Sequence, residues 1–399
     1  MRNVLLALLS YGLCWGQGPD DCKPSSLNIP GAPYPCVYAD RSVTFRVAAP
    51  DAQKVQVRLG GAHDMTRGQD GLWMATIPPQ VIGFHYYSIV VDGAVMADPA
   101  TRTFFGSGWD NSGIEIPESD TDAAYYAARD VPHGQVSQRW YYSKVTGKWR
   151  RCYVYTPPDY ETNARSRYPV LYLLHGWGEN EQGWHTQGHA DLIMDNLIAE
   201  KKARPMLIVM DNLNAVKPGE DASLYAARGS IARLTVEPAP TGGGRGAPGA
   251  ARGGFPSNFG GVFTEMLLTD LIPMVERTYR VAPGRENRAM AGLSMGGAHT
   301  IQFGLPHPEL FHYVGVFSMT GGGEQYEQAN DAALKRAAKM LKLMYYAYGR
   351  EDPVVRNPAP FKTTLEKYNI KLTLHETGGG HTWINWREYL NDLAPRLFR

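Results

Sequence analysis

The chain has 399 residues, of which 43% are hydrophobic and 20% are charged, so it is long and apolar enough to bury a sizeable core. Its formal net charge of +1 at pH 7 excludes strong long-range attraction to nucleic acids or anionic membranes as the basis of its function. This length predicts two or three domains.

The first residues have the pattern of an export signal. Arg2 precedes the apolar run VLLALLSYGLCW, and the small and polar residues GQGPDD follow it. The run is short for a membrane span. We expect residues 1–18 to be a signal peptide and the protein to be secreted or periplasmic, with no membrane contact after cleavage. A buried first helix and a lipid anchor are the alternatives.

The four cysteines suit an oxidising compartment. Signal cleavage would remove Cys14, and Cys22 and Cys36 could then close a small loop through a disulfide. The position of Cys152 in a strand-like run predicts a buried thiol. No cysteine cluster has the spacing of a zinc site, and we expect neither a metal nor a cofactor.

Residues 25–118 have the sequence of an all-β domain. SVTFRV and KVQVRL alternate apolar and polar residues, and GLWMATI and HYYSIVVDG follow after Gly, Pro and Asp. We expect an immunoglobulin-like β-sandwich. These segments resemble the early-set modules of carbohydrate-binding module family 48, which implies contact with glycans. A structural spacer is the alternative, and Trp73 suits either a sugar-stacking or a core position.

After a polar, irregular linker at 119–146, residues 147–399 alternate strands with helices. YPVLYLLHG, RPMLIVMDN, RAMAGLS, YVGVFSM and LMYYAYG are apolar runs, and segments of helical periodicity lie between them. This order predicts the α/β class, a mostly parallel sheet with helices on both faces. Residues 237–256 are Gly, Pro, Ala and Arg with no apolar period, which predicts a surface loop.

The stretch AGLSMGGAHT places Ser294 between glycines where a strand meets a helix. G-x-S-x-G at such a turn is a nucleophile elbow, in which the tight backbone leaves no room for neighbouring side chains. The helix that follows points its amides at a developing anion. We therefore expect Ser294 to be a nucleophile and the Met295 amide an oxyanion donor. A glycine-rich turn capped by serine is the alternative.

A serine nucleophile needs a base and an acid, which follow it in chain order in this fold. His381 comes after TGGG, in a glycine loop beyond the last strand, and we expect it to be the base in preference to His375 inside that strand. The preceding strand ends before Glu351 and Asp352, and Asp352 is the preferred acid.

A second oxyanion donor is expected on LLHGWGENEQGW, after the first long strand. The Trp177 amide is suitably placed there, and we expect His175 to be structural. Trp184 and Trp383 are predicted to bind substrate as part of an aromatic pocket. Core packing is the alternative for all these tryptophans and is the expectation for Trp386.

The segments YVYTPPDY, YPVLYLLHGWG, LIVMDN, NRAMAGLSMGG and GGGHTWINWREYL together resemble carbohydrate esterase family 1, the feruloyl and acetyl-xylan esterases of the α/β-hydrolase fold. The resemblance runs from about residue 138 to 398. It implies that Ser294 is the nucleophile, Asp352 the acid and His381 the base. It also implies that the amides of Met295 and Trp177 form the oxyanion hole.

The resemblance implies a secreted serine esterase that acts on acylated plant polysaccharide or oligosaccharide. Nearby tryptophans favour ferulate over acetate as the acyl group. An enterochelin-esterase-like hydrolase and a mycolyl-type acyltransferase are alternatives on the same fold, and a non-catalytic glycan-binding protein is the least favoured because all triad members are present. Every predicted catalytic residue lies after position 170, so we expect the chemistry not to need the N-terminal module.

Overall fold

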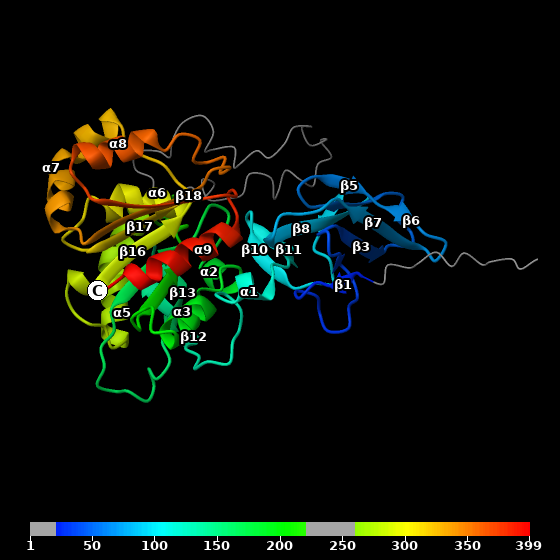
Figure 1. Cartoon of the computed structure of the whole chain (residues 1–399), viewed down its shortest axis with the longest axis horizontal. Coiled ribbons are helices and arrows are strands. Elements are labelled where there is room, and N and C mark those ends of the chain that lie inside the picture. Colours follow the sequence, from blue (N-terminus) through cyan, green and yellow to red (C-terminus); the bar gives the residue numbers. More distant parts are fainter. Residues whose placement is uncertain (1–20, 221–259) are drawn as a thin grey trace, which may run out of the picture.

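The computed structural model describes residues 21–220 and 260–399. The predicted signal peptide at 1–18 and the predicted surface loop at 237–256 lie outside the described residues. A β-sandwich and a larger α/β domain lie side by side along the long axis of the molecule (Figure 1). The disulfide predicted between Cys22 and Cys36 is present, and Cys152 is a buried free thiol as expected.

The N-terminal domain is a sandwich of two sheets whose inward side chains form one core. Phe45 from one sheet and Val57 from the other are fully buried in it. Trp73 is only 8% exposed and donates its indole N–H to the Ala49 carbonyl at 2.9 Å, so it is a core residue. The first sheet has the order β1 (Lys23–Pro24), β2 (Cys36–Val37), β3 (Val43–Ala48), β7 (Leu72–Ile77) and β6 (Thr66–Arg67). The second has the order β10 (Thr103–Gly106), β11 (Trp109–Ile116), β8 (Gly83–Val91), β4 (Val55–Arg58) and β5 (Ala62–Asp64), with β9 (Ala94–Met96) paired to β8.

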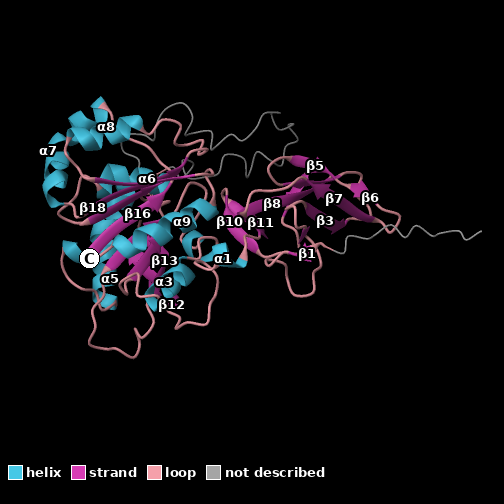
Figure 2. Ribbon diagram, in the orientation of Figure 1, coloured by secondary structure: helices cyan, strands magenta, loops and turns pink. Residues whose placement is uncertain are grey.

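The α/β domain is built on an eight-stranded sheet (Figure 2). In this sheet, β13 runs antiparallel to both of its neighbours, β12 and β15. The strands from β15 to the far edge are parallel to one another. The order is β12 (Gln135–Ser143), β13 (Lys148–Thr156), β15 (Leu207–Asp211), β14 (Val170–Leu174), β16 (Arg288–Leu293), β17 (Tyr313–Phe317), β18 (Leu343–Gly349) and β19 (Leu372–Thr377).

The edge strand β12 corrects the expectation that residues 119–146 form an irregular linker. Residues 135–143 pair with β13 along their whole length. Most side chains of β12 are exposed, because an edge strand on the outer face of the sheet has few neighbours to pack against. It therefore lacks the apolar alternation that marks a half-buried strand.

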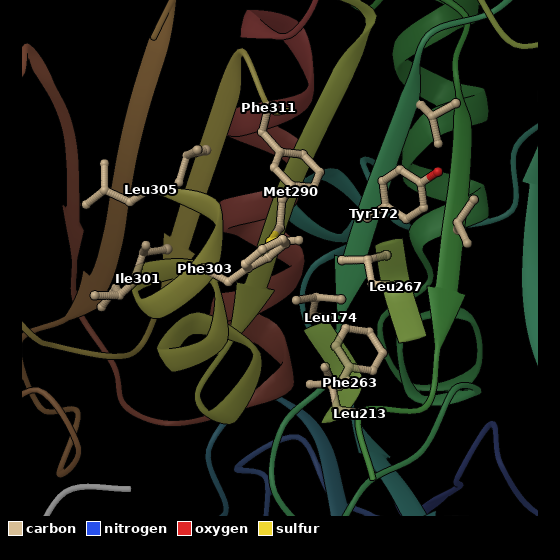
Figure 3. Close-up of a cluster of buried hydrophobic side chains, with 14 of the residues drawn as sticks. Tyr172, Leu174, Leu213, Phe263, Leu267, Met290, Ile301, Phe303, Leu305 and Phe311 are labelled. Carbon is tan, nitrogen blue, oxygen red and sulfur yellow. The ribbon is translucent and has the colours of Figure 1, made fainter. Parts of the chain in front are cut away.

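Helices cover both faces of the sheet, as the sequence predicts. Successive side chains of β14 point to opposite faces, so Tyr172 and Leu174 pack in one cluster, drawn in Figure 3, and Leu171 and Leu173 in another. The first face is covered by α4 (Gly261–Met266), the π-helical turn Leu267–Leu271, α5 (Ile272–Thr278), α6 (Met295–His299), the π-helical turn Thr300–Gly304, α7 (Glu324–Met340) and α8 (Ala359–Lys367). The second face is covered by α2 (Gly183–Thr186), α3 (Ala190–Ala199) and α9 (Trp383–Leu393). The short helices α1 (Asp120–Ala123), Arg285–Asn287 and Ala394–Arg396 complete the described elements.

The sandwich and the α/β domain share a buried seam. Phe84 and Phe104 of the sandwich belong to the same core cluster as the residues of α3 and α9. At its centre, Arg387 of α9 is fully buried and makes hydrogen bonds of 2.6 and 3.1 Å to the two carboxylate oxygens of Glu115 in β11. The Arg387 guanidinium also donates to the Gln187 carbonyl at 2.9 and 2.7 Å. The two domains therefore meet through apolar packing and a bidentate ion pair whose arginine is fully buried.

Candidate active site

Ser294 occupies a strained turn between β16 and α6. Its φ of 51° and ψ of −113° lie in a region that non-glycine residues rarely adopt. The turn is held because the Ser294 N–H donates to the Phe317 carbonyl of the next strand at 2.9 Å. The Ser294 carbonyl accepts from the Ala298 N–H at 2.9 Å, which starts the helix. The nucleophile elbow expected from the sequence is thus present as a backbone conformation.

The glycines around Ser294 are required by the closeness of the backbone. A β-carbon on Gly292 would lie 2.5 Å from the carbonyl carbon of Gly296. A β-carbon on Gly296 would lie 2.6 Å from the carbonyl oxygen of Leu174, at the end of the neighbouring strand β14. Larger residues at either position would push the elbow away from the sheet edge and from the loop that follows β14.

His381 and Asp352 come together from separate loops at the same edge of the sheet. The Nδ1 atom of His381 lies 3.0 and 3.1 Å from the two carboxylate oxygens of Asp352. The Asp352 side chain is buried and also accepts the Val354 N–H at 2.9 Å, whereas Glu351 is exposed. Of the two acids that the sequence leaves open, Asp352 is the one in contact with the histidine. The contact fixes the ring with Nδ1 toward the acid and Nε2 available as a base.

The other candidate histidine, His375, is engaged elsewhere. Its Nε2 lies 3.2 Å from Glu388 Oε1 and its Nδ1 lies 3.8 Å from Asp392 Oδ2, both on α9. His299, inside the helix after the elbow, is fully buried, and desolvation lowers its pKa to about 3. His375 therefore pairs with carboxylates on α9, and His299 has no carboxylate partner among the described residues, whereas His381 pairs with Asp352 in the loop after β18.

The loop after β14, which we call the oxyanion loop (residues 175–182), lies beside the nucleophile. A β-carbon on Gly176 would be 3.5 Å from the β-carbon of Ser294. The Gly176 carbonyl accepts from His175 Nδ1 at 2.8 Å and from the Glu179 N–H at 3.3 Å. Because a trans peptide directs its C=O and N–H oppositely, holding this carbonyl also sets the direction of the Trp177 N–H.

His175 has the structural role expected of it. Its Nε2 accepts the Leu213 N–H at 2.9 Å, so the proton of the neutral ring is on Nδ1 and is donated to Gly176. Burial lowers the pKa of His175 to about 4, which keeps the ring neutral at ordinary pH. Trp177 itself is half-buried, and Met295 is fully buried at the start of α6.

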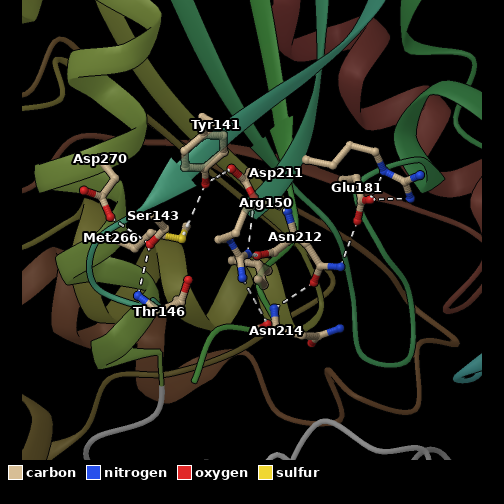
Figure 4. Close-up of polar contacts among 12 residues, drawn as sticks. Tyr141, Ser143, Thr146, Arg150, Glu181, Asp211, Asn212, Asn214, Met266 and Asp270 are labelled. Carbon is tan, nitrogen blue, oxygen red and sulfur yellow. Dashed lines mark hydrogen bonds and ion pairs between the residues drawn. The ribbon is translucent and has the colours of Figure 1, made fainter. Parts of the chain in front are cut away.

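Polar contacts from β13 and the segment after β15 hold the far end of the oxyanion loop (Figure 4). Asn212 donates its side-chain amide to Glu181 at 2.8 Å, and Arg151 donates to the same carboxylate at 2.6 Å. The Asn214 amide donates to the Glu179 carbonyl at 3.3 Å. The loop is thereby fixed to the sheet.

The structure places Trp184 and Trp383 differently from the prediction that they bind substrate. They are 1% and 2% exposed, and their rings pack edge to face at 5.5 Å within the core. The indole N–H of Trp184 donates to the Leu174 carbonyl at 2.9 Å. The physical reason is that both residues lie on the buried faces of helices α2 and α9, so neither offers a surface to a ligand.

Trp386 contacts the predicted base, a contact that the sequence does not reveal. Its ring lies edge to face with the His381 ring at 5.0 Å, and its indole N–H donates to Ser318 Oγ at 2.9 Å. Trp386 is therefore a core residue, as expected, and also a wall that limits the rotation of the imidazole. Within residues 21–220 and 260–399, no group of three or more His, Cys, Asp or Glu side chains is placed to hold a metal ion.

This geometry suits acyl transfer through a serine. A hydroxyl on a strained elbow, an acid–histidine pair and two backbone amides beside it are the parts that form and stabilise a tetrahedral intermediate. The roles of Ser294, His381, Asp352, Met295 and Trp177 stay predictions from geometry and motif.

Comparison with known proteins agrees with the geometry. The family model described as "Putative esterase" matches residues 143–243 and 259–397. The chain belongs to this esterase family. An "Endo-1,4-beta-xylanase/feruloyl esterase" of Xylanibacter ruminicola is 36% identical over 390 residues, covering 95% of this chain and 48% of that protein. The esterase thus spans about half the length of this curated relative.

Solved structures confirm the α/β-hydrolase fold. A carbohydrate esterase family 1 ferulic acid esterase of Anaeromyces mucronatus is 25% identical and matches with a TM-score of 0.53 over 69% of this chain and 94% of that chain. The enterobactin esterase of Shigella flexneri is 17% identical, with a TM-score of 0.57 over 88% of this chain and 93% of that chain. The resemblance to carbohydrate esterase family 1 and the assignment as a carboxylic-ester hydrolase are confirmed.

In the described ranges, no helix is long and apolar enough to cross a membrane.

Proposed function

We propose that the esterase hydrolyses feruloyl esters carried by plant cell-wall polysaccharides. Ser294 Oγ attacks the ester carbonyl while His381 Nε2 takes its proton, and the Trp177 and Met295 amides stabilise the oxyanion. The sugar oxygen leaves with the proton from His381, and the acyl group stays on the serine. Water then repeats the cycle, which releases ferulate and restores the Ser294 hydroxyl. The observation that carries this proposal is the His381–Asp352 pair at the same sheet edge as the Ser294 elbow.

The substrate class is supported by the relatives. The 36% identical protein is described as a xylanase and feruloyl esterase, and the structural relative at 25% identity is described as a ferulic acid esterase. The similarity to the enterobactin esterase, at 17% identity, supports the fold alone. Acetyl-xylan esterase activity is therefore the less favoured version of the proposal.

A row of exposed aromatic side chains at the sheet edge supports a polymeric substrate. Trp140, Tyr142 and Trp149 are 54%, 52% and 64% exposed and share the outer face of β12 and β13. The guanidinium of Arg151 lies 6.0 Å from the Trp140 ring on the same face. Flat apolar rings beside a hydrogen-bond donor suit the faces and hydroxyls of sugar rings, and exposed apolar patches commonly mark binding surfaces.

Export is also part of the proposal. The Cys22–Cys36 disulfide supports an oxidising compartment, since disulfides are rare in reducing cytosol.

A comparison of ester substrates tests the function. Ferulate release from methyl ferulate and from feruloylated arabinoxylan, measured by chromatography, should exceed acetate release from acetylated xylan. Ser294→Ala should leave thermal stability unchanged and abolish hydrolysis. The fall in kcat should be about 10⁶-fold if the triad acts as a unit. Equal hydrolysis by Ser294→Ala would refute the serine mechanism, and acetate release without ferulate release would refute the acyl preference.

A further inference from the structure

The β-sandwich reaches the oxyanion loop directly. The Tyr86 hydroxyl, on β8 of the sandwich, donates to Glu179 Oε1 at 3.0 Å and lies 3.3 Å from the Phe105 carbonyl. Gln187 of the α/β domain donates its side-chain amide to the same hydroxyl at 2.5 Å. Two residues that lie 93 positions apart in the chain therefore share a hydrogen bond across the seam.

A second contact joins the two backbones. The Gly108 N–H of the sandwich donates to the Gly178 carbonyl of the oxyanion loop at 2.8 Å. Gly178 has a φ of +73°, and a β-carbon there would lie 2.9 Å from the Ser107 Cα. Only glycine allows the loop this conformation and this closeness to the sandwich.

These contacts are closed to solvent. Glu179 is 6% exposed and Gln187 is 1% exposed, so their polar atoms depend on partners within the protein. Burial raises the pKa of Glu179 to about 8 and that of Tyr86 well above its usual range. Both groups are therefore neutral near neutral pH, and an uncharged hydrogen bond connects the sandwich to the loop.

These contacts lie next to the residue whose amide is a predicted oxyanion donor. Trp177, whose amide is the predicted oxyanion donor, lies between Gly176 and Gly178. His175 and the Glu179 N–H hold the Gly176 carbonyl, whereas Gly108 holds the Gly178 carbonyl. The residue that follows, Glu179, is held by Tyr86. The sandwich thus restrains the two residues that follow Trp177: the Gly178 carbonyl and the Glu179 carboxyl group.

We propose that Tyr86 and the Gly108 amide are positioning groups for the oxyanion hole, so that the N-terminal sandwich takes part in setting the catalytic rate. This inference rests on the proposed serine-esterase function and differs from the expectation that the chemistry does not need the module. The sandwich supplies no reacting atom. It supplies the orientation of a loop whose amide must point at the developing oxyanion.

Tyr86→Phe tests the inference in the full-length chain. The substitution removes one hydroxyl, and Tyr87→Phe is a matched control on the same strand. Tyr87 is 2% exposed, and its hydroxyl bonds Asp98 at 2.8 Å inside the sandwich. Both variants lose a buried hydrogen bond, but only Tyr86→Phe loses one to the oxyanion loop.

We expect Tyr86→Phe to lower kcat for 4-nitrophenyl acetate about tenfold, less than the 10²–10³-fold cost of deleting an oxyanion donor. KM should stay within about twofold, because the perturbed contact acts in the transition state. The affinity for a phenylboronic acid, whose serine adduct mimics the tetrahedral intermediate, should fall in parallel. Tyr87→Phe should lower Tm but leave kcat and boronate affinity unchanged.

An unchanged kcat in folded Tyr86→Phe would overturn the inference, and so would equal losses of kcat in both tyrosine variants. If Tyr86→Phe does not fold, Glu179→Met removes the same hydrogen bond from the side of the oxyanion loop and carries the same expectations. A wild-type enzyme that hydrolyses no ester would instead overturn the proposed function, so the two failures are distinguishable.

Discussion

Replacing Glu179 by glutamine tests whether burial in the oxyanion loop raises the pKa of this carboxyl group. The carboxyl group is 6% exposed, and its Oε2 has no well-formed hydrogen bond among the described residues. Burial is the largest influence and raises the pKa of Glu179 from 4.5 to about 8, although Tyr86 and the nearby Trp383 indole favour the ionised form. Glutamine keeps the shape of the side chain and removes the titration.

The effect of Glu179 on the free energy of unfolding follows from the difference between its pKa values in the folded and unfolded states. Below pH 4.5 both states hold the proton, and Glu179 adds no pH dependence. Between pH 4.5 and about 8 only the unfolded state releases it, so the free energy of unfolding falls as the pH rises. At about 1.4 kcal/mol per pKa unit, the loss attributable to Glu179 reaches about 5 kcal/mol at most by pH 8. Above that pH both states are ionised and the loss stays constant.

Urea unfolding followed by circular dichroism from pH 5 to 8.5 measures this loss. The free energy of unfolding of Glu179→Gln minus that of wild type should rise by several kcal/mol as the pH increases across this range. Glu181→Gln is the matched control, because it removes a loop carboxylate that pairs with Arg151 at 2.6 Å and should lower stability at neutral pH. Parallel pH profiles for wild type and Glu179→Gln would show that the acid titrates normally and would refute the reasoning.

Three further predictions follow from the geometry. His381→Ala should abolish ester hydrolysis, whereas His375→Ala, which loses only contacts to α9, should retain most of kcat in the same assay; the reverse result would move the base to His375. Arg387→Met should cost about 3–5 kcal/mol in urea unfolding because it leaves the Glu115 carboxylate without its buried partner, and a loss below 1 kcal/mol would show that the pair is dispensable. Trp149→Ala should raise KM for feruloylated arabinoxylan several-fold and leave KM for methyl ferulate unchanged, and equal effects on both substrates would argue against a polymer-binding surface.

The sequence predicts those parts of the site that are marked by neighbouring residues in the chain. The Ser294 elbow follows from glycines that a strand-to-helix turn requires, and the glycine loop before His381 marks the end of the last strand. Asp352 and Glu351 follow the preceding strand, but only the folded chain shows which of them contacts the histidine.

Other features depend on contacts between distant segments. Glu179 lies in a polar stretch that suggests solvent exposure, and its burial depends on Tyr86 of another domain. Trp184 and Trp383, which are 199 positions apart in the chain, pack on each other, and nothing in the sequence near either tryptophan distinguishes a core ring from a pocket ring. Strand β12 pairs at an edge where most of its side chains face solvent, so its residues carry no apolar pattern.

The buried ion pair of the seam limits how this chain can recombine during evolution. Arg387 is fully enclosed and is satisfied by Glu115 from the sandwich and by the Gln187 carbonyl from its own domain. A recombination that replaced the sandwich alone would leave a guanidinium in the core without its counter-ion unless the incoming domain brought an acid at the same place. Exchange of the sandwich between relatives should therefore succeed only where the donor carries the matching carboxylate.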